Sequence, residues 1–548
     1  MIMKRSYFES IGNLPDKIKS LAKNEFFLLV LIMLIAFSLR FGNLGEKTLY
    51  GDEILSLNIV KHYQHQPAEM IAYLQEIEIH PPLYYLMLDY WLDLTGLDDY
   101  SAKLLSAIFG LAMVFSVYFV SKNLFSSNRI GLTAAFITSI LPMQIEYSMQ
   151  ARPYIIYCFI GLWHVFFLWR YFESGKIRNL ALYCLSALVG LYLHYSFAFI
   201  LIASTSYYFF MAASKQLGKK EMTRWLFSMT AIFLGFYWWL KYFLYKYFLQ
   251  RSILFNMDLR ASIDSLKNTN FFGTTMNQLI WTDVINEHGY VEVFAILFTK
   301  IFILGVIIYF IMYLDRDSEG RSLYLKKICY FGWLLVVPLI IYFFSPQSIG
   351  YTDINERHLI LGSVIIAILL AVLADRLGKK TRLLFFILFF ASVAIYDSKI
   401  VFENMYLRLG CRAENLSAMI TGNYRPGDLV VLYYGHQRAN LNHFLPEKIE
   451  TVSFYPVWLL DWQSDYLASR DTLGLIENEL QLRIDHGNDQ DKEKKIEYLL
   501  GKHSPTRIWL ITRDVHEQFF PLWLFNHGWK KDDLSKNTCK YVELFEKK

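Results

Sequence analysis

The stretch Leu49–Leu88, "LYGDEILSLNIVKHYQHQPAEMIAYLQEIEIHPPLYYLML", decides how the rest of the sequence is interpreted. It follows an apolar run at 26–43 and opens with two adjacent carboxylates, Asp52 and Glu53. It ends with a His-Pro-Pro turn at His80, after which the chain is apolar and aromatic again. A carboxylate at a membrane edge costs free energy unless it is solvated or partnered, so this position favours a functional role. A solvated helix start with aspartate at the N-cap is the alternative.

The composition predicts a protein with many membrane spans. Of the 548 residues, 55% are apolar, 17% are aromatic and only 19% are charged. The mean hydropathy is +0.28. These values exclude an ordinary soluble protein, and five cysteines are too few for a disulfide-rich scaffold. No cleavage site follows the first apolar run, so we expect it to be a retained span.

The apolar runs predict an α-helical bundle with about eleven transmembrane helices. The continuous run at 180–213 is about 33 residues long, too long for one helix across a hydrocarbon core of about 30 Å. We therefore divide it at His194-Tyr195. The expected spans are 26–43, 104–120, 132–149, 154–172, 180–193, 196–213, 225–243, 292–314, 328–345, 359–375 and 383–396.

The basic residues predict the orientation of the bundle. With the N-terminus in the cytoplasm, the inner segments contain 22 Lys and Arg residues and the outer segments contain 9. An excess of positive charge on the cytoplasmic side is the usual arrangement. The predicted location is therefore the cell inner (plasma) membrane, with outer segments at 43–103, 150–153, 244–291 and 346–358.

The residues after the last span predict a second domain at 397–548, outside the membrane, whereas 1–396 form the transmembrane domain. Strand-like runs occur at "DLVVLYYG", "RIWLIT" and "KYVELFE", and a charged helical pattern occupies 485–502. We expect an α/β fold. Cys411 and Cys539 could pair there in an oxidising compartment or stay as free thiols.

Polar side chains recur at the predicted outer ends of separate spans. Two prolines hold His80 at a fixed point. Arg152 lies in a tight turn between the third and fourth spans, and Arg357 enters the tenth. The forked donors of arginine suit a phosphate group. The alternative for Arg152 is snorkelling to lipid headgroups, and the alternative for Arg357 is a local salt bridge.

This combination of carboxylates and cations fits the transfer of a phosphate-linked group onto a hydroxyl. The carboxylate removes the proton of the acceptor as a general base. The arginines stabilise the phosphate as it leaves. Attack opposite the leaving group inverts the anomeric centre, as in single-displacement glycosyl chemistry.

The motifs resemble those of GT-C membrane glycosyltransferases, in the branch of protein O-mannosyltransferases and aminoarabinose-to-lipid-A transferases. The resemblance covers most of 26–375. It is carried by Asp52-Glu53, the run "HPPLYYLML" at 80–88, "EYSMQARPY" at 146–154, "LYLHYSF" at 191–197 and "NERHLILG" at 355–362.

The resemblance implies a sugar donor linked to polyprenyl phosphate and an acceptor that is a lipid, a cell-envelope glycan or a protein, with no nucleic acid involved. It implies Asp52 as the catalytic base with Glu53 in support. It also implies donor-phosphate binding by Arg152 and Arg357. The expected cavity or substrate-binding residues are His80, Tyr154, His194, Asp353 and His358.

Several features depart from the family pattern. Many relatives have Arg-Tyr where this chain has Arg357-His358. Many have Arg-Leu-Pro before the second span, where this chain has "AKLLSA", so we expect Lys103 to substitute in phosphate binding. No β-trefoil domain is evident, which favours a bacterial enzyme of the cell envelope.

Two questions stay open in the sequence. No cofactor is required for a leaving monophosphate, although a divalent metal is possible because Asp52, Glu53 and His80 are metal-capable. The predicted enzyme is a hexosyl- or pentosyltransferase. The alternative is a transporter or flippase of a lipid-linked sugar, against which the sequence has no evident internal repeat.

Overall fold

The computed structural model divides the chain into two compact units. It describes residues 24–254, 319–343, 356–389, 413–455 and 489–547, apart from short gaps at 43, 46–48, 50, 77–79, 215–217, 385, 388, 435–440, 442–444, 447, 450, 512–518 and 533–541. The first unit comprises 1–45 and 78–397, and the second comprises 46–77 and 398–548. The segment 46–77, which we expected within the transmembrane domain, therefore groups with the C-terminal part.

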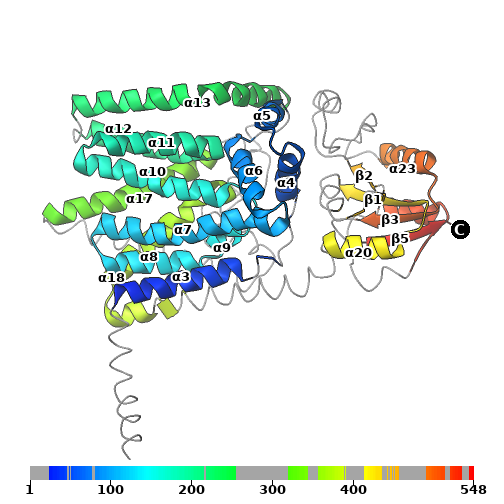
Figure 1. The fold of residues 1–548 in the computed structure, drawn as a ribbon, viewed down its shortest axis with the longest axis horizontal. Coiled ribbons are helices and arrows are strands. Elements are labelled where there is room, and N and C mark those ends of the chain that lie inside the picture. Colours follow the sequence, from blue (N-terminus) through cyan, green and yellow to red (C-terminus); the bar gives the residue numbers. More distant parts are fainter. Residues whose placement is uncertain are drawn as a thin grey trace, which may run out of the picture. The chain divides into compact units, whose positions relative to one another are not determined.

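The first unit is a helical bundle (Figure 1). Among the described residues, three helices are long and apolar enough to cross a membrane, namely 99–125, 154–174 and 324–341, and two shorter apolar helices accompany them. The helices of this unit are α3 Glu25–Phe41, α6 Leu83–Thr95, α7 Asp99–Phe125, α8 Asn128–Ile140, α9 Pro142–Ser148, α10 Tyr154–Ser174, α11 Ile177–Leu193, α12 Phe197–Ala213, α13 Lys219–Leu254, α17 Glu319–Phe343, η2 Glu356–Leu359 and α18 Leu361–Arg376.

The predicted division at His194-Tyr195 is confirmed. Helix α11 ends at Leu193, His194 is extended with φ −162° and ψ 138°, and α12 begins at Phe197. The predicted spans at 292–314 and most of 383–396 lie outside the described residues.

The prediction of one span over 132–149 is wrong. Helix α8 ends at Ile140, Leu141 has φ −65° and ψ 123°, and α9 starts at Pro142. Proline has no N–H to continue the helix and disfavours a helical conformation in the residue before it. Helix α8 is therefore only about 20 Å long, and a separate short helix leads to the turn that contains Arg152.

A buried arginine stabilises this break. Arg40 of α3 has no exposed surface, and it donates hydrogen bonds to the carbonyls of Thr138 at 3.2 Å and Ser139 at 2.9 Å. The last carbonyls of a helix lack partners within the helix and carry partial negative charge. Arg40 thus caps α8 from a neighbouring helix.

Two glycines allow helices to approach closely. A Cβ on Gly110 of α7 would lie 2.0 Å from Ser148 Oγ of α9. A Cβ on Gly190 of α11 would lie 2.2 Å from the ring of Phe197, the first residue of α12. Small residues let helix backbones pack closely in membranes. Gly110 therefore lets α9 pack closely against α7 just before the turn into α10. Gly190 lets α12 begin close to the end of α11.

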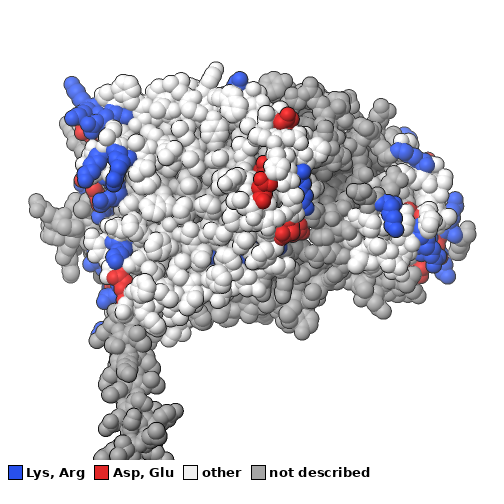
Figure 2. Space-filling view, viewed as in Figure 1, with Lys and Arg blue, Asp and Glu red and all other residues white. Residues whose placement is uncertain are grey.

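The first unit has one basic end. Figure 2 shows Lys and Arg gathered at one end of the helices, with few charges along their length. We call this the basic end. The residues there include Lys122, Arg129, Arg170, Lys176, Arg178, Lys219, Lys220 and Arg224, at the ends of α7, α8, α10, α11 and α13.

The second unit contains a five-stranded sheet in the order β2-β1-β3-β5-β4. Strands β2, β1 and β3 are parallel, and β5 and β4 are antiparallel. The predicted α/β fold and its three strand-like runs are confirmed. The elements are α4 Gly51–His62, α5 Pro67–Glu76, α20 Ala413–Asn423, β1 Asp428–Tyr434, β2 Thr451–Tyr455, α23 Asp489–His503, β3 Arg507–Ile511, α24 Phe519–Asn526, β4 Trp529–Lys531 and β5 Val542–Lys547.

Both faces of the sheet are buried. Leu429 and Val431 pack on one face with α23 and α24, whereas Val430 and Leu432 pack on the other with α20. This alternation follows from the period of two in a strand. At the N-terminal ends of β1 and β3, Arg507 binds the buried carboxylate of Asp428 at 2.6 Å.

Candidate functional site

Five basic or imidazole side chains of the first unit gather around the ring of Tyr154. They come from the turn before α6, the α9–α10 turn, the α11–α12 turn and η2. All of these segments lie away from the basic end, because α10 begins beside this site and ends at the basic end. We call the group the cationic cluster, and its members are His80, Arg152, His194, Arg357 and His358.

The two arginines share one aromatic ring. The guanidinium carbon of Arg152 lies 5.8 Å from the ring centroid of Tyr154, and that of Arg357 lies 5.4 Å from it. Tyr154 is the first residue of α10 and is only 1% exposed. The negative face of an aromatic ring attracts cations without neutralising them as a carboxylate does. The ring therefore holds two positive groups that are far apart in sequence.

Arg152 is anchored at both its backbone and its side chain. The residue is 2% exposed, and its Nη2 lies 3.4 Å from Nε2 of His80. Its carbonyl accepts a hydrogen bond from Ser106 Oγ of α7 at 3.3 Å. Lys103 lies one helical turn before Ser106 and is also buried. The side chain of Arg152 is thus positioned from two directions.

The imidazole of His194 lies at the centre of the cationic cluster. Its ring centroid is 5.4 Å from those of His80, His358 and Tyr157, and 5.3 Å from that of Tyr154. His194 is 3% exposed. It therefore lies beside residues from three other segments of the first unit, namely the turn before α6, α10 and η2.

Burial and positive charge favour the neutral form of His194. Burial is the largest cause that lowers its pKa well below the usual range. His80, His358, Arg152 and Arg357 lower the pKa further because each disfavours another positive charge. Among the described residues, the charges that act on this ring are positive, which favours an anion beside it.

Ser196 connects two imidazoles of the cluster. Its backbone N–H donates to Nδ1 of His194 at 3.1 Å, and its Oγ lies 2.6 Å from Nδ1 of His358. The Tyr157 hydroxyl donates a hydrogen bond to the carbonyl of Arg357. The α11–α12 turn and η2 are therefore tied together by side chains from α10 and from the turn itself.

The structure brings together six of the residues selected from the sequence: His80, Arg152, Tyr154, His194, Arg357 and His358. Asp52 and Glu53 lie in the first turn of α4, which belongs to the second unit. Glu53 is fully buried and Asp52 is half-buried. Asp353, Cys411 and Cys539 lie outside the described residues.

Metal binding stays an open prediction. Within the described part of the chain, no three His, Cys, Asp or Glu side chains form a group suited to a metal ion. Cys158, Cys184 and Cys329 are free thiols on α10, α11 and α17.

Two members of the site, Tyr157 and Ser196, were not selected from the sequence. Tyr157 lies three residues after Tyr154 on one helix, so the two share a face, and this spacing was visible in the sequence. Ser196 contacts His358 across 162 positions, and no local pattern indicates that contact.

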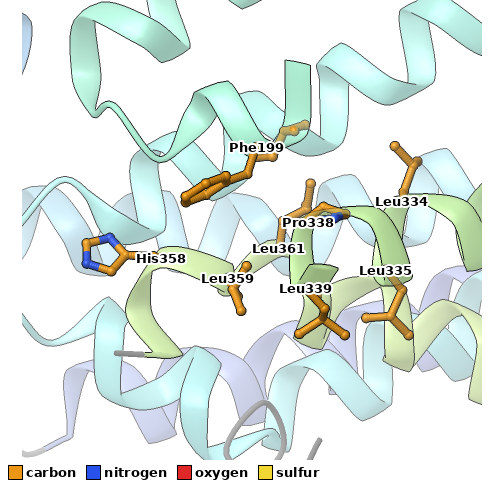
Figure 3. Close-up of a pocket in the computed structure, with 10 residues that line it drawn as sticks. Phe199, Leu334, Leu335, Pro338, Leu339, His358, Leu359 and Leu361 are labelled. Carbon is orange, nitrogen blue, oxygen red and sulfur yellow. The ribbon is translucent and has the colours of Figure 1, made fainter. Parts of the chain in front are cut away.

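An apolar pocket begins at the cationic cluster. It lies between the start of α12, α17, η2 and the start of α18. Figure 3 shows His358 at one end and Leu334 and Leu335 at the other. His358 is the polar side chain of its lining, and the remaining lining residues are Phe199, Ile200, Leu334, Leu335, Pro338, Leu339, Leu359, Leu361 and Gly362.

Comparison with solved structures confirms the predicted fold. The chain is similar to ArnT from Cupriavidus metallidurans bound to undecaprenyl phosphate, with a TM-score of 0.53 and 10% identity over 94% of this chain and 97% of that one. The apo state of the same protein gives a TM-score of 0.54 at 11% identity, with the same coverage. The fold is therefore that of a multi-pass GT-C membrane protein.

Two further comparisons give a sequence match to part of the chain and a weaker structural similarity. Residues 79–240 match the sequence model of the dolichyl-phosphate-mannose-protein mannosyltransferase family. The oligosaccharyltransferase AglB from Archaeoglobus fulgidus, in complex with an inhibitory peptide and a dolichol-phosphate, gives a TM-score of 0.47 at 11% identity, over 89% of this chain and 69% of that one. No curated protein sequence matches this chain.

Proposed function

We propose that this protein is an inverting glycosyltransferase that transfers a sugar from a polyprenyl-phosphate donor to a hydroxyl group. The acceptor is a lipid, a cell-envelope glycan or a protein at the outer face of the inner membrane. The observation that carries the proposal is the pair of guanidiniums of Arg152 and Arg357 on the ring of Tyr154, at 5.8 and 5.4 Å. Arginine binds phosphate oxygens with paired donors, so two guanidiniums held over one ring suit a phosphate group.

The location of the cationic cluster supports an outer-face reaction. Cytoplasmic ends of membrane helices carry an excess of Lys and Arg, which fits the basic end of the bundle. The cluster lies at the opposite end of α10, a helix of 21 residues and about 31 Å. We therefore place the donor phosphate in the outer leaflet and the N-terminus in the cytoplasm.

The apolar pocket supports a lipid-linked donor. An amphiphile with an anionic head needs a positive site that continues into an apolar one. The pocket meets this need, because it starts at His358 of the cationic cluster and continues among leucines of α17. We propose that the first isoprene units of the donor occupy it.

The reaction that we propose is a single displacement. The acceptor oxygen forms a bond to the anomeric carbon while the bond from that carbon to the phosphate oxygen breaks. The bonding electron pair stays on the phosphate, and the proton of the acceptor passes to a carboxylate base. The sequence resemblance proposes Asp52 as this base, with Glu53 in support, and Lys103 as a further group near the phosphate.

A transfer assay on full-length protein in lipid nanodiscs tests the function. A panel of undecaprenyl-phosphate hexoses and pentoses is offered with an extract rich in acceptors, and release of undecaprenyl phosphate is followed. We expect turnover with at least one donor, and loss of turnover in a folded Asp52→Asn variant.

The same assay contains the result that would contradict the proposal. Movement of intact donor across the bilayer, without release of undecaprenyl phosphate from any donor, would instead indicate a flippase. If Asp52→Asn still turned over the donor, the protein would be a glycosyltransferase, but Asp52 would not be its catalytic base.

A further inference from the structure

We infer that His194 donates a hydrogen bond from Nε2 to an oxygen of a lipid-linked phosphate in the cationic cluster, and that Ser196 fixes the tautomer that allows it. This inference rests on the proposed function for its catalytic consequence, although the binding of a lipid phosphate is tested independently of any transfer.

The tautomer of His194 follows from one hydrogen bond. The backbone N–H of Ser196 lies 3.1 Å from Nδ1, and an amide nitrogen can only donate. Nδ1 is therefore an acceptor and carries no proton. In a neutral imidazole the remaining proton is then on Nε2. His194 thus presents an N–H donor on the side of its ring away from the Ser196 amide.

This donor lacks a partner in the described part of the chain. Nε2 of His194 is buried and makes no hydrogen bond to any described residue. The residue as a whole is 3% exposed. A buried donor without an acceptor is costly, so the great majority of such groups are satisfied. The position indicates an acceptor that arrives with a ligand.

A second buried histidine shows how the same bundle satisfies a structural imidazole. Nδ1 of His164 on α10 lies 3.1 Å from Ser186 Oγ and 3.2 Å from the Tyr183 carbonyl. Its Nε2 lies 3.1 Å from Ser204 Oγ. Both nitrogens of His164 therefore have partners, whereas only Nδ1 of His194 has one among the described residues.

The charge around His194 selects the kind of acceptor. Among the described residues, the groups that act on it electrostatically are basic, namely His80, His358, Arg152 and Arg357. An anionic oxygen is therefore favoured over a neutral carbonyl. A neutral imidazole can contribute a hydrogen bond without adding another positive charge to the cluster. The ligand class is a phosphate ester attached to a long apolar chain, since the apolar pocket starts at the neighbouring His358.

The donor has a direct consequence for catalysis. The polyprenyl phosphate in the sugar donor is a diester with one negative charge, and it becomes a monoester with more negative charge as the bond to the anomeric carbon breaks. His194 keeps its proton throughout the reaction, so it neither gains nor loses a proton in the transfer step. A fixed donor aimed at an oxygen that gains charge stabilises the transition state more than the ground state.

Three variants of the full-length protein in nanodiscs test the inference. His194→Leu removes the donor, His194→Gln keeps an amide N–H, and His164→Leu removes a buried imidazole outside the cationic cluster. Undecaprenyl phosphate is the binding probe, and phosphatidylglycerol and inorganic phosphate are the competitors. Titration gives the affinity, thermal unfolding gives the stability, and the donor panel gives kcat and KM separately.

We expect His194→Leu to bind undecaprenyl phosphate at least tenfold more weakly than the wild type and to lose roughly 10²-fold in kcat, the usual scale for one lost oxyanion donor. We expect His194→Gln to recover most of both. His164→Leu should bind the probe like the wild type, however much its melting temperature falls. The competitors should not displace the probe at equal concentration.

Several results would overturn the inference. Equal loss in His194→Leu and His194→Gln would indicate packing instead of a hydrogen bond. Undiminished binding by His194→Leu, or displacement of the probe by inorganic phosphate alone, would exclude His194 as a contact for a lipid phosphate. If no donor in the panel turns over while binding still depends on an N–H at position 194, the proposed function fails and the inference stands.

Discussion

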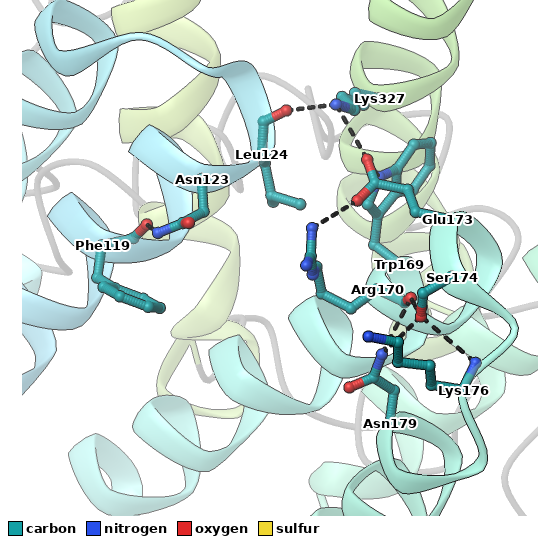
Figure 4. A network of polar contacts seen from close by, with 10 residues as sticks. All are labelled: Phe119, Asn123, Leu124, Trp169, Arg170, Glu173, Ser174, Lys176, Asn179 and Lys327. Carbon is teal, nitrogen blue, oxygen red and sulfur yellow. Dashed lines mark hydrogen bonds and ion pairs between the residues drawn. The ribbon is translucent and has the colours of Figure 1, made fainter.

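Charged side chains at the two ends of the first unit have different neighbours. At the basic end, Figure 4 shows Glu173 of α10 between several donors. Trp169 Nε1 donates to it at 2.8 Å, Arg170 at 3.0 Å, and Lys327 of α17 lies 3.1 Å from it. Lys327 also donates to the carbonyl of Leu124, at the end of α7. Each cation in this network has an acid or a carbonyl, and the network joins three helices.

At the cationic cluster, positive groups gather on one aromatic ring and around one neutral imidazole. Arg152 and Arg357 lie over Tyr154, and three imidazoles lie beside them. A phosphate group is the kind of anion that such a set of donors suits. We infer that charge at the basic end stabilises the bundle, whereas charge at the cluster serves the binding of a ligand.

The largest expected effect comes from substituting arginines at the two ends of α10. Arg152→Met should lower kcat/KM with the polyprenyl-phosphate sugar by about 10²–10³-fold, because it removes a charged donor from the developing phosphate. Arg170→Met is the matched control. Its side chain is 44% exposed in an ion pair, and such pairs contribute little, so its kcat/KM should change by less than about twofold. Steady-state kinetics give kcat/KM for both variants. An equal loss of kcat/KM in both would contradict the proposed difference between the two ends of α10.

The second effect is on stability at the basic end. Lys327→Met should lower the free energy of unfolding by about 2–4 kcal/mol, since it leaves Glu173 and the α7 carbonyl without a buried cation. Thermal unfolding measures the loss. The kcat per folded molecule should stay near the wild-type value, and a fall in kcat with unchanged stability would contradict the structural role.

The third effect concerns the turn that holds His194. Gly190→Ala should cost about 1–3 kcal/mol, because its Cβ would lie 2.2 Å from the rigid ring of Phe197 and push α12 away from α11. Binding of undecaprenyl phosphate should weaken as well.

Gly332→Ala on α17 is the control for this change, because a Cβ there meets nothing within 4 Å. It should be neutral or stabilise by up to about 1 kcal/mol through helix propensity. If Gly190→Ala bound undecaprenyl phosphate with the wild-type affinity, the position of the His194 turn would not depend on how α11 and α12 pack.

The smallest expected effect concerns the apolar pocket. Leu335→Trp should raise KM about tenfold, or about 1.4 kcal/mol, for a donor with a full undecaprenyl chain, and leave a donor with two isoprene units unchanged. Val336→Trp, at the next position of α17 and outside the pocket, is the control. Equal effects on both donors would mean that the pocket does not hold the chain.

The sequence by itself determined the class of fold and selected six residues that the structure brings together. Apolar runs predicted helices because a membrane requires long apolar segments, and the division at His194-Tyr195 followed from length alone. Arg152 and Arg357 were selected because arginine suits a phosphate group, His80 because two prolines fix its position, and His194 from the family resemblance.

Only the tertiary structure decided how these residues meet. The break at Leu141-Pro142 is stabilised by Arg40 of another helix, which caps the end of α8. A hydropathy pattern does not indicate a cap that comes from a distant residue. Three features of the site depend on contacts between positions up to 203 apart in the chain: the ring that holds both arginines, the serine that joins two imidazoles, and the nitrogen of His194 that bears the proton. Local sequence specifies the ends of helices, but the contacts across those ends come from helix packing, because distant segments become neighbours only when the bundle is assembled.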